Sequence, residues 1–295
     1  MLYQAIRSRA AMVTAVGLFC IALSSCLVAH PAGARPLDDV VASGTLRVAV
    51  YSDNKPFSTA GNGTPAGIDV ALAEAIARKL NVGLDLRIVE AGEDADGDFR
   101  LNLWKGDLAG TPLADLMLHV PNDRQLALRN EQIFLTAPYF EQHIAFAYRK
   151  GELDGLQSLG DTEGHPIAVE AGGSADMLIL LAEGGRYREN VQHFRDFAAA
   201  AAAFVAKQTP VLAGTKAEIQ AALHDANISP DDAPVIEIKV VGMVKNSWEL
   251  AGATRSDSRD LAYAAGNAIS ALVKSGELKA ICEKYGVAFT PPKLD

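Results

Sequence analysis

The sequence predicts an α/β protein in which strands and helices alternate along the chain. Short runs rich in aliphatic and β-branched residues are followed by longer segments in which apolar residues recur every three or four positions. Of the 295 residues, 49% are hydrophobic and 21% are charged, as in packed globular proteins. This length predicts one large domain or two moderate ones, because single cores stop growing at about 250–300 residues.

The alternation can be followed from one end of the chain to the other. The predicted strands are residues 45–50, 84–89, 115–120, 143–148, 166–170, 211–212 and 235–241. The predicted helices are residues 69–80, 101–105, 174–181, 197–207, 258–274 and 277–285. Strands that alternate with helices predict a parallel sheet with helices on its faces.

Two of these helices show how the prediction is made. Apolar residues recur every four positions from Ile68 to Leu80, and Asp69 suits the positive N-terminal end of a helix over residues 69–80. Residues 197–207 contain six consecutive alanines with aromatic residues on either side. Alanine is the strongest helix former, so this segment predicts a packed helix rather than a low-complexity linker.

The first 34 residues are predicted to be a secretory signal peptide. Arg7 and Arg9 form a basic head, residues 10–29 carry no charge, and residues 32–34 read Ala-Gly-Ala. A basic head, an apolar stretch and an A-x-A end are typical of a cleaved export signal.

Two alternatives exist for this leader. About 20 apolar residues could span a bilayer as an anchor. Residues 23–26 read Leu-Ser-Ser-Cys and resemble a lipobox, in which Cys26 would become the acylated first residue. Cleavage after residue 34 and cleavage before Cys26 both predict an exported chain.

Charge and cysteine content limit the partners and the stabilising devices of the exported chain. The full chain carries a net charge of −9, and removal of the leader changes it to −11, because the leader holds two arginines and no acids. So acidic a chain lacks the clustered cations that bind nucleic acid. Cys282 is then the only thiol, so no internal disulfide can form, and its apolar neighbours predict a core position.

No motif for metal binding or catalysis is found. The acidic segment 93–98 lacks the spacing and the distal glutamate of a calcium loop, which predicts a solvated loop. The six histidines show no ligand spacing, and His119, in an apolar run, is expected to be satisfied by a neighbour in the core or a cleft. Neither G-x-S-x-G nor a P-loop occurs. The sequence therefore predicts no metal, no cofactor and no enzyme.

Several segments, in the expected order, resemble the bacterial extracellular solute-binding proteins of family 3, the receptors of polar amino-acid ABC importers. The similar segments are residues 45–50, 55–58, 67–77, 135–140, 275–281 and 283–286. The resemblance implies the type 2 periplasmic-binding-protein fold, with two α/β lobes, two crossing strands as the hinge and a location in the periplasm. Lobe 1 would comprise residues 45–142 plus 250–290, and lobe 2 residues 143–249.

The resemblance also implies ligand-binding residues. Arg129 corresponds to the arginine that clamps a ligand carboxylate, with a surface or inter-lobe salt bridge as its alternative role. Gly173 and Ser174 correspond to the helix start whose N–H groups bind the same carboxylate. Phe57 corresponds to an aromatic wall of the cleft. Gly214 stands where the family has the aspartate that binds the ligand amine, so an ordinary amino-acid receptor is not expected.

The segment 114–121 resembles a narrower group, the members encoded with periplasmic quinoprotein methanol dehydrogenases (the XoxJ/MxaJ type). This resemblance implies an accessory partner of a PQQ-dependent methanol dehydrogenase or of its cytochrome. Two alternatives stay open: an ABC-importer receptor for a small carboxylated solute, and a dehydratase-type enzyme that acts in the cleft.

Overall fold

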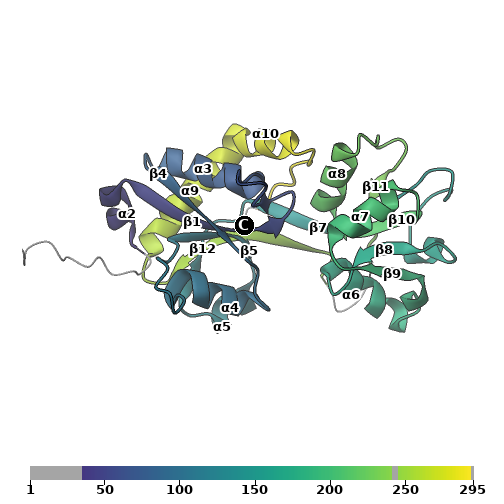
Figure 1. Cartoon of the computed structure of the whole chain (residues 1–295), viewed down its shortest axis with the longest axis horizontal. Helices are drawn as coiled ribbons and strands as arrows, with labels where there is room; N and C mark the ends of the chain where they lie inside the picture. Colours follow the sequence, from purple (N-terminus) through teal and green to yellow (C-terminus); the bar gives the residue numbers. More distant parts are fainter. Residues whose placement is uncertain (1–34, 241–244, 294–295) are drawn as a thin grey trace, which may run out of the picture. The chain divides into compact units, whose positions relative to one another are not determined.

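The structure, a computed structural model, describes residues 35–240 and 245–293 (Figure 1). The predicted signal peptide, residues 1–34, lies outside the described residues. The α-helices are α2 (Leu37–Ser43), α3 (Ile68–Lys79), α4 (Ala95–Phe99), α5 (Arg124–Arg129), α6 (Ser174–Leu181), α7 (Phe197–Val205), α8 (Lys216–Asp225), α9 (Arg259–Ser275) and α10 (Glu277–Lys284). A π-helical turn, η1 (Arg100–Trp104), follows α4, and short 3-10 turns occur at Leu159–Thr162, Ala182–Gly184 and Arg188–Asn190.

The strands of the described residues are β1 (Thr45–Tyr51), β2 (Asp53–Asn54), β3 (Ser58–Thr59), β4 (Gly83–Val89), β5 (Leu116–Pro121), β6 (Ile133–Leu135), β7 (Phe140–Tyr148), β8 (Ile167–Glu170), β9 (Val191–Phe194), β10 (Val211–Thr215), β11 (Val235–Ile236) and β12 (Ser247–Arg255). Hydrogen bonds connect the longer strands in the order β4-β1-β5-β12-β7-β10-β8-β9. Strands β4, β1 and β5 are parallel, and so are β10, β8 and β9. The predicted parallel arrangement is therefore present at both ends of this order.

The centre of the order departs from the prediction, because β12 and β7 run antiparallel to each other and to their outer neighbours. The first half of β7 pairs with β12, and its second half, from Ile144, pairs with β10. The chain thus passes from one group of strands to the other along β7 and returns along β12. The lobe boundaries predicted at 142/143 and 249/250 fall inside these two strands and stay predictions.

The first group of strands has a hydrophobic layer on each face. One layer joins α3, α9 and α10 to the sheet through residues such as Leu72, Ile269 and Leu278, all fully buried. The other layer joins α4, η1 and α5 to the opposite face through Phe99 and Leu103. Figure 1 shows α3 and α9 on one side of β1 and β5, and α4 and α5 on the other. This is the alternation that a doubly covered α/β sheet requires.

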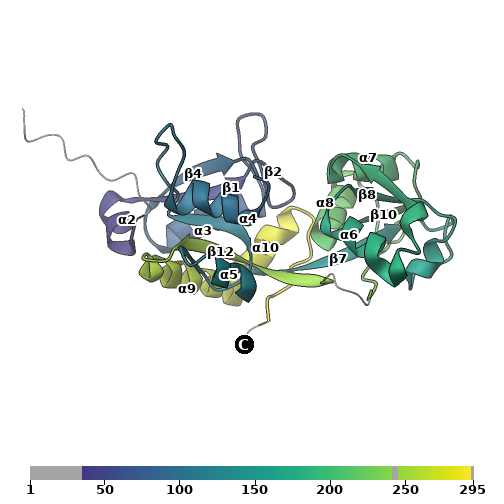
Figure 2. The same ribbon diagram turned by 90° about the horizontal axis from the view of Figure 1, so that it is seen from below.

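The second group of strands is also covered on both faces. Ile144 and Phe146 of β7 point into a layer shared with α6, whereas Ala145 and Ala147 point into a layer shared with α7 and α8. Successive side chains of a strand face opposite sides, so β7 supplies residues to both layers. Figure 2 shows α6, α7 and α8 around β8 and β10.

Two predicted elements differ from the structure. Of the predicted strand 235–241, only Val235 and Ile236 form β11; residues 237–240 make no ladder, and 241 lies outside the described residues. The short helix predicted at 101–105 is the π-helical turn that continues α4. Within the described residues, no helix is long and apolar enough to cross a membrane.

Candidate ligand-binding site

A cavity of about 170 Å³ lies at the carboxyl ends of the parallel strands β8 and β10. Ligands of open α/β sheets bind in this place, because the strand ends and the following helix starts meet there. The lining residues are Val169, Glu170, Gly173, Ser174, Ala175, Phe197, Ala213, Gly214, Thr215 and Glu218. Three residues singled out in the sequence, Gly173, Ser174 and Gly214, are thus brought together in one cavity.

The start of α6 forms one wall of this cavity. Gly172, at φ +77°, occupies the left-handed region that favours glycine and turns the chain into the helix. No side chain caps the helix at Gly173. Its first N–H groups therefore have no acceptor on the N-cap residue, which is a feature of anion-binding helix starts.

Phe197, the first residue of α7, also lines this cavity. A Cβ atom built onto Gly214 would lie 2.4 Å from Cε2 and 2.9 Å from Cδ2 of Phe197. Packed interiors do not tolerate contacts this short, so any larger residue at 214 needs the ring to move. The N-cap Asp196 holds the start of α7 by accepting a hydrogen bond from the N–H of Ala199 at 2.7 Å.

Two carboxyl groups give the cavity an acidic lining. Glu218 accepts hydrogen bonds from the N–H of Thr215 at 2.9 Å and from its hydroxyl at 2.7 Å, which completes a capping box at the start of α8. Burial raises the pKa of the Glu218 carboxyl. Burial, and then repulsion by Glu218, raises the pKa of Glu170.

This acidic lining opposes the attraction that the α6 start offers to an anion. A unit charge at about 4 Å contributes about 4 kcal/mol at an effective dielectric constant of about 20. A helix terminus contributes only about 0.3–1 kcal/mol. With Glu170 and Glu218 both in the wall, the cavity disfavours a carboxylate and suits a neutral or positively charged group.

Arg129 does not line this cavity. It is the last residue of α5, and its Nε donates to the two carboxylate oxygens of Asp96 at 3.1 and 2.9 Å. The Arg129 side chain is 55% exposed. Its guanidinium, together with a hydrogen bond from Asn130, holds the pKa of Asp96 below its usual range. The structure thus places Arg129 in an exposed ion pair, and a role in binding a ligand stays a prediction.

Phe57 is 1% exposed and lies in a separate aromatic cluster. Its ring packs edge-on against His119, with ring centroids 4.5 Å apart, and against Phe140 at 5.4 Å. Protein groups therefore cover the ring that the resemblance assigns to the wall of a cleft.

His119 is held by a buried carboxylate, as predicted from its apolar surroundings. Its Nδ1 lies 3.0 Å from Oδ2 of Asp69, which is fully buried. The Tyr139 hydroxyl donates to Oδ1 of Asp69 at 2.7 Å and accepts the N–H of His119 at 3.2 Å. Sequence analysis did not predict this Asp69–His119–Tyr139 cluster, because its members are far apart along the chain.

The acidic segment 93–98 is not a purely solvated loop. Asp94 caps α4 by accepting from the N–H of Gly97 at 2.7 Å. Asp98 is 4% exposed and accepts from the Tyr51 hydroxyl and the Gly92 N–H, each at 2.8 Å. The prediction is wrong for Asp98, because its carboxylate is buried and accepts two hydrogen bonds within the protein. Among residues 35–240 and 245–293, no cluster of three or more His, Cys, Asp or Glu residues could hold a metal ion.

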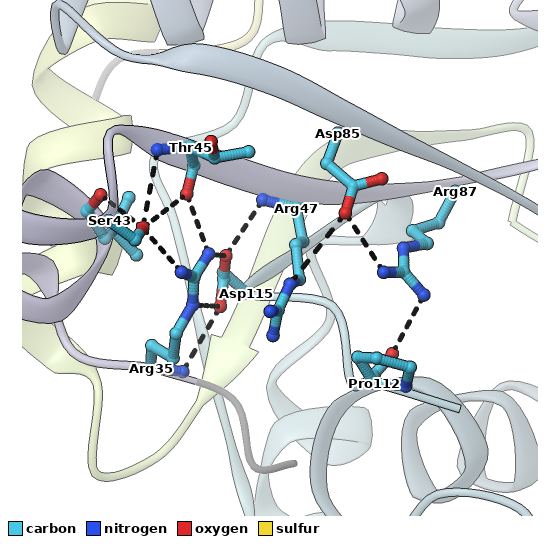
Figure 3. A network of polar contacts seen from close by, with 9 residues as sticks. Arg35, Ser43, Thr45, Arg47, Asp85, Arg87, Pro112 and Asp115 are labelled. Carbon is cyan, nitrogen blue, oxygen red and sulfur yellow. Dashed lines mark hydrogen bonds and ion pairs between the residues drawn. The ribbon is translucent and has the colours of Figure 1, made fainter. Parts of the chain in front are cut away.

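A larger cavity of about 380 Å³ lies beside β4 and contains none of the predicted site residues. Arg87 in its wall is already engaged, since it donates to Asp85 at 3.0 Å and to the carbonyl of Pro112 at 3.2 Å (Figure 3). Both Nη atoms of Arg87 are thus paired within the protein, whereas its buried Nε has no partner among the described residues.

Solved structures of binding proteins match most of the chain. An ancestral cationic amino-acid solute-binding protein is 21% identical over 85% of this chain and 99% of its own, with a TM-score of 0.66. An amino-acid ABC transporter substrate-binding protein from Streptococcus pneumoniae, bound to L-arginine, is 20% identical over 87% and 99%, with a TM-score of 0.60. The L-cysteine receptor of Neisseria gonorrhoeae is 18% identical over 85% and 93%, with a TM-score of 0.55. No protein-family model and no curated protein matches the sequence.

These similarities confirm the predicted fold class. The chain has the two-lobed α/β fold of periplasmic binding proteins, with β7 and β12 as the two crossing strands. All three neighbours are named as binding proteins or receptors.

Proposed function

We propose that this chain is a periplasmic, solute-binding-like protein without catalytic activity that acts as an accessory partner of a PQQ-dependent methanol (alcohol) dehydrogenase. The observation that carries the proposal is the contact between Phe197 and Gly214. At the position where the resemblance places the carboxylate that binds the ligand ammonium, this chain has no side chain, and a larger residue would require the Phe197 ring to move.

The charges around the cavity support the same conclusion. Binding of an amino acid requires one partner for its ammonium and one for its carboxylate, and each charge-assisted hydrogen bond contributes about 1.5–3 kcal/mol. The arginine expected to clamp the carboxylate is paired with Asp96 instead. Glu170 and Glu218 add like charges beside the helix start that would bind a carboxylate. The carboxylate end of a free amino acid is therefore disfavoured in this cavity.

The class of partner comes from the resemblance of residues 114–121, which include the whole of β5. The net charge of −11 without the leader favours a basic patch on the partner. Such a contact weakens with salt, because the Debye length falls from about 10 Å at 0.1 M to about 3 Å at 1 M.

The test is binding of the immobilised chain 35–295 to a purified quinoprotein methanol dehydrogenase and, separately, to its cytochrome. We expect one of them to be retained at low salt and released at high salt. The arginine-bound Streptococcus pneumoniae protein has the same fold and serves as the control. Equal retention by the control, or no retention of either partner, would refute the accessory role.

A second function, a receptor for an imported solute, is favoured by the cavity itself, which contains the uncapped start of α6. Calorimetry against the common amino acids separates the two proposals. We expect no micromolar binding, and such binding would support the receptor and contradict the accessory role. If a plain carboxylate binds, Arg129→Ala should weaken it; an unchanged affinity would exclude Arg129 from the site.

A further inference from the structure

A fully buried carboxylate lies directly before β5. Asp115 is 0% exposed, and its Oδ2 accepts the N–H of Arg47 at 2.8 Å. The other donors all belong to Arg35, the first described residue (Figure 3). Arg35 Nε donates to Oδ1 at 3.0 Å, an Nη donates to Oδ2 at 2.6 Å, and the backbone N–H lies 3.3 Å from Oδ1.

The rest of the Arg35 guanidinium is also engaged. One Nη donates to the Ser43 hydroxyl at 2.6 Å, and the other also donates to the carbonyl of Thr45 at 2.7 Å. The side chain is 14% exposed. The planar fork of arginine suits this bidentate arrangement. Together, Arg35, Ser43, Thr45 and Asp115 form what we call the N-terminal anchor, which ties the start of the described chain to β1 and β5.

We infer that Arg35 is the first residue of the mature protein and that its freed α-ammonium becomes part of the N-terminal anchor. An endopeptidase that removes leaders would hydrolyse the bond between Ala34 and Arg35. Water adds across this bond, which leaves a carboxylate on Ala34 and an ammonium on Arg35. The nitrogen that becomes charged is the one that already faces Asp115.

The geometry explains why this position suits the cut. A cut after Arg35 would leave Asp115 buried and without its charged partner, which is strongly destabilising. A cut several residues earlier, as in a lipoprotein that begins at Cys26, would leave an uncharged amide at Arg35. A charged donor forms a stronger hydrogen bond to a carboxylate than an amide does. The inference shares only the exported location with the proposed function and does not depend on any partner.

The direct test is the intact mass and N-terminal sequence of the protein purified from the periplasm of an expressing cell. We expect a chain that begins at Arg35. A chain that begins at an acylated Cys26, at another residue, or at Met1 would overturn the inference, whatever partner the protein binds.

A stability comparison tests the role of the ammonium. Chains 35–295 and 33–295 differ by two added residues, and we expect the shorter chain to melt about 2–4 °C higher. In an Asp115→Asn background this difference should disappear. Equal melting temperatures of the two wild-type chains would contradict the role of the ammonium.

Because Asp115→Asn removes a buried charge and could prevent folding, a second pair of variants is needed. Arg35→Gln should lower the melting temperature of chain 35–295 by several degrees. Arg186→Gln is the matched control, because Arg186 is 57% exposed and pairs with Glu163 on the surface. Equal effects of the two substitutions would refute the anchor.

Discussion

The substitution Gly214→Ala tests whether Phe197 closes the candidate site. The added methyl group would start 2.4 Å from Cε2 of the ring, whereas ordinary contacts of a Cβ atom begin near 3.4 Å. Relief of this overlap requires the ring to rotate out of the cavity or α7 to shift. Overpacking of this kind costs about 1–3 kcal/mol. At about 2–4 °C per kcal/mol for a domain of 150–250 residues, the expected loss of melting temperature is several degrees.

Thermal and urea unfolding of the chain 35–295 measure this effect. Gly155→Ala is the matched control, because a Cβ atom at Gly155 meets nothing within 4 Å and its backbone is not left-handed. It should leave stability unchanged or raise it slightly, since alanine restricts the unfolded chain. In the double variant Gly214→Ala, Phe197→Ala, the cost should be smaller than the sum of the single costs. If Gly214→Ala behaves like Gly155→Ala, the ring moves freely and the closed site is refuted.

Three further substitutions or reactions test the other buried groups. Tyr139→Phe should destabilise the fold by about 1.5–3 kcal/mol in urea unfolding, because the buried carboxylate of Asp69 loses a donor at 2.7 Å. The control Tyr263→Phe, at a position 62% exposed, should have no effect. Glu218→Gln should stabilise the fold at neutral pH, because burial raises the pKa of this carboxyl and so disfavours its charged form. This gain in stability should vanish as the pH falls below the normal carboxyl range, where the wild-type carboxyl is protonated in the folded and the unfolded chain. Burial raises the pKa of Cys282 to about 12, so a thiol reagent at pH 8 should react only after unfolding.

The elements predicted with closest bounds are those with strong periodicity. The predicted helix 69–80 is α3 (Ile68–Lys79), and the predicted helix 258–274 is α9 (Arg259–Ser275). Each presents one continuous apolar face, so spacing alone identifies it. Strand β12 (Ser247–Arg255) was not predicted from its residues, because it mixes buried small residues with polar ones. The predicted parallel direction was wrong for β7 and β12, since periodicity shows which face of a strand is buried but not how the strand is paired.

The candidate site also contains features that the sequence predicted and features that depend on tertiary packing. The turn at Gly172 and the start of α6 are local features, and the sequence identified them. The ring of Phe197 over Gly214 depends on how α7 packs beside β10, which no spacing along the chain shows. The direction of Arg129 likewise depends on Asp96, which lies 33 residues away.

By itself the sequence determined the α/β class, the leader-like first 34 residues and the acidic charge, because each is a property of composition or of neighbouring residues. The missing acid at Gly214 is instead what the family resemblance implies. Only the tertiary structure decided which charges meet. His119 and Asp69 are 50 residues apart, and Arg35 and Asp115 are 80 residues apart, yet each pair is in hydrogen-bond contact. Burial removes water from these groups, so each must find its partner within the folded chain, and that choice is made when distant strands and helices pack together.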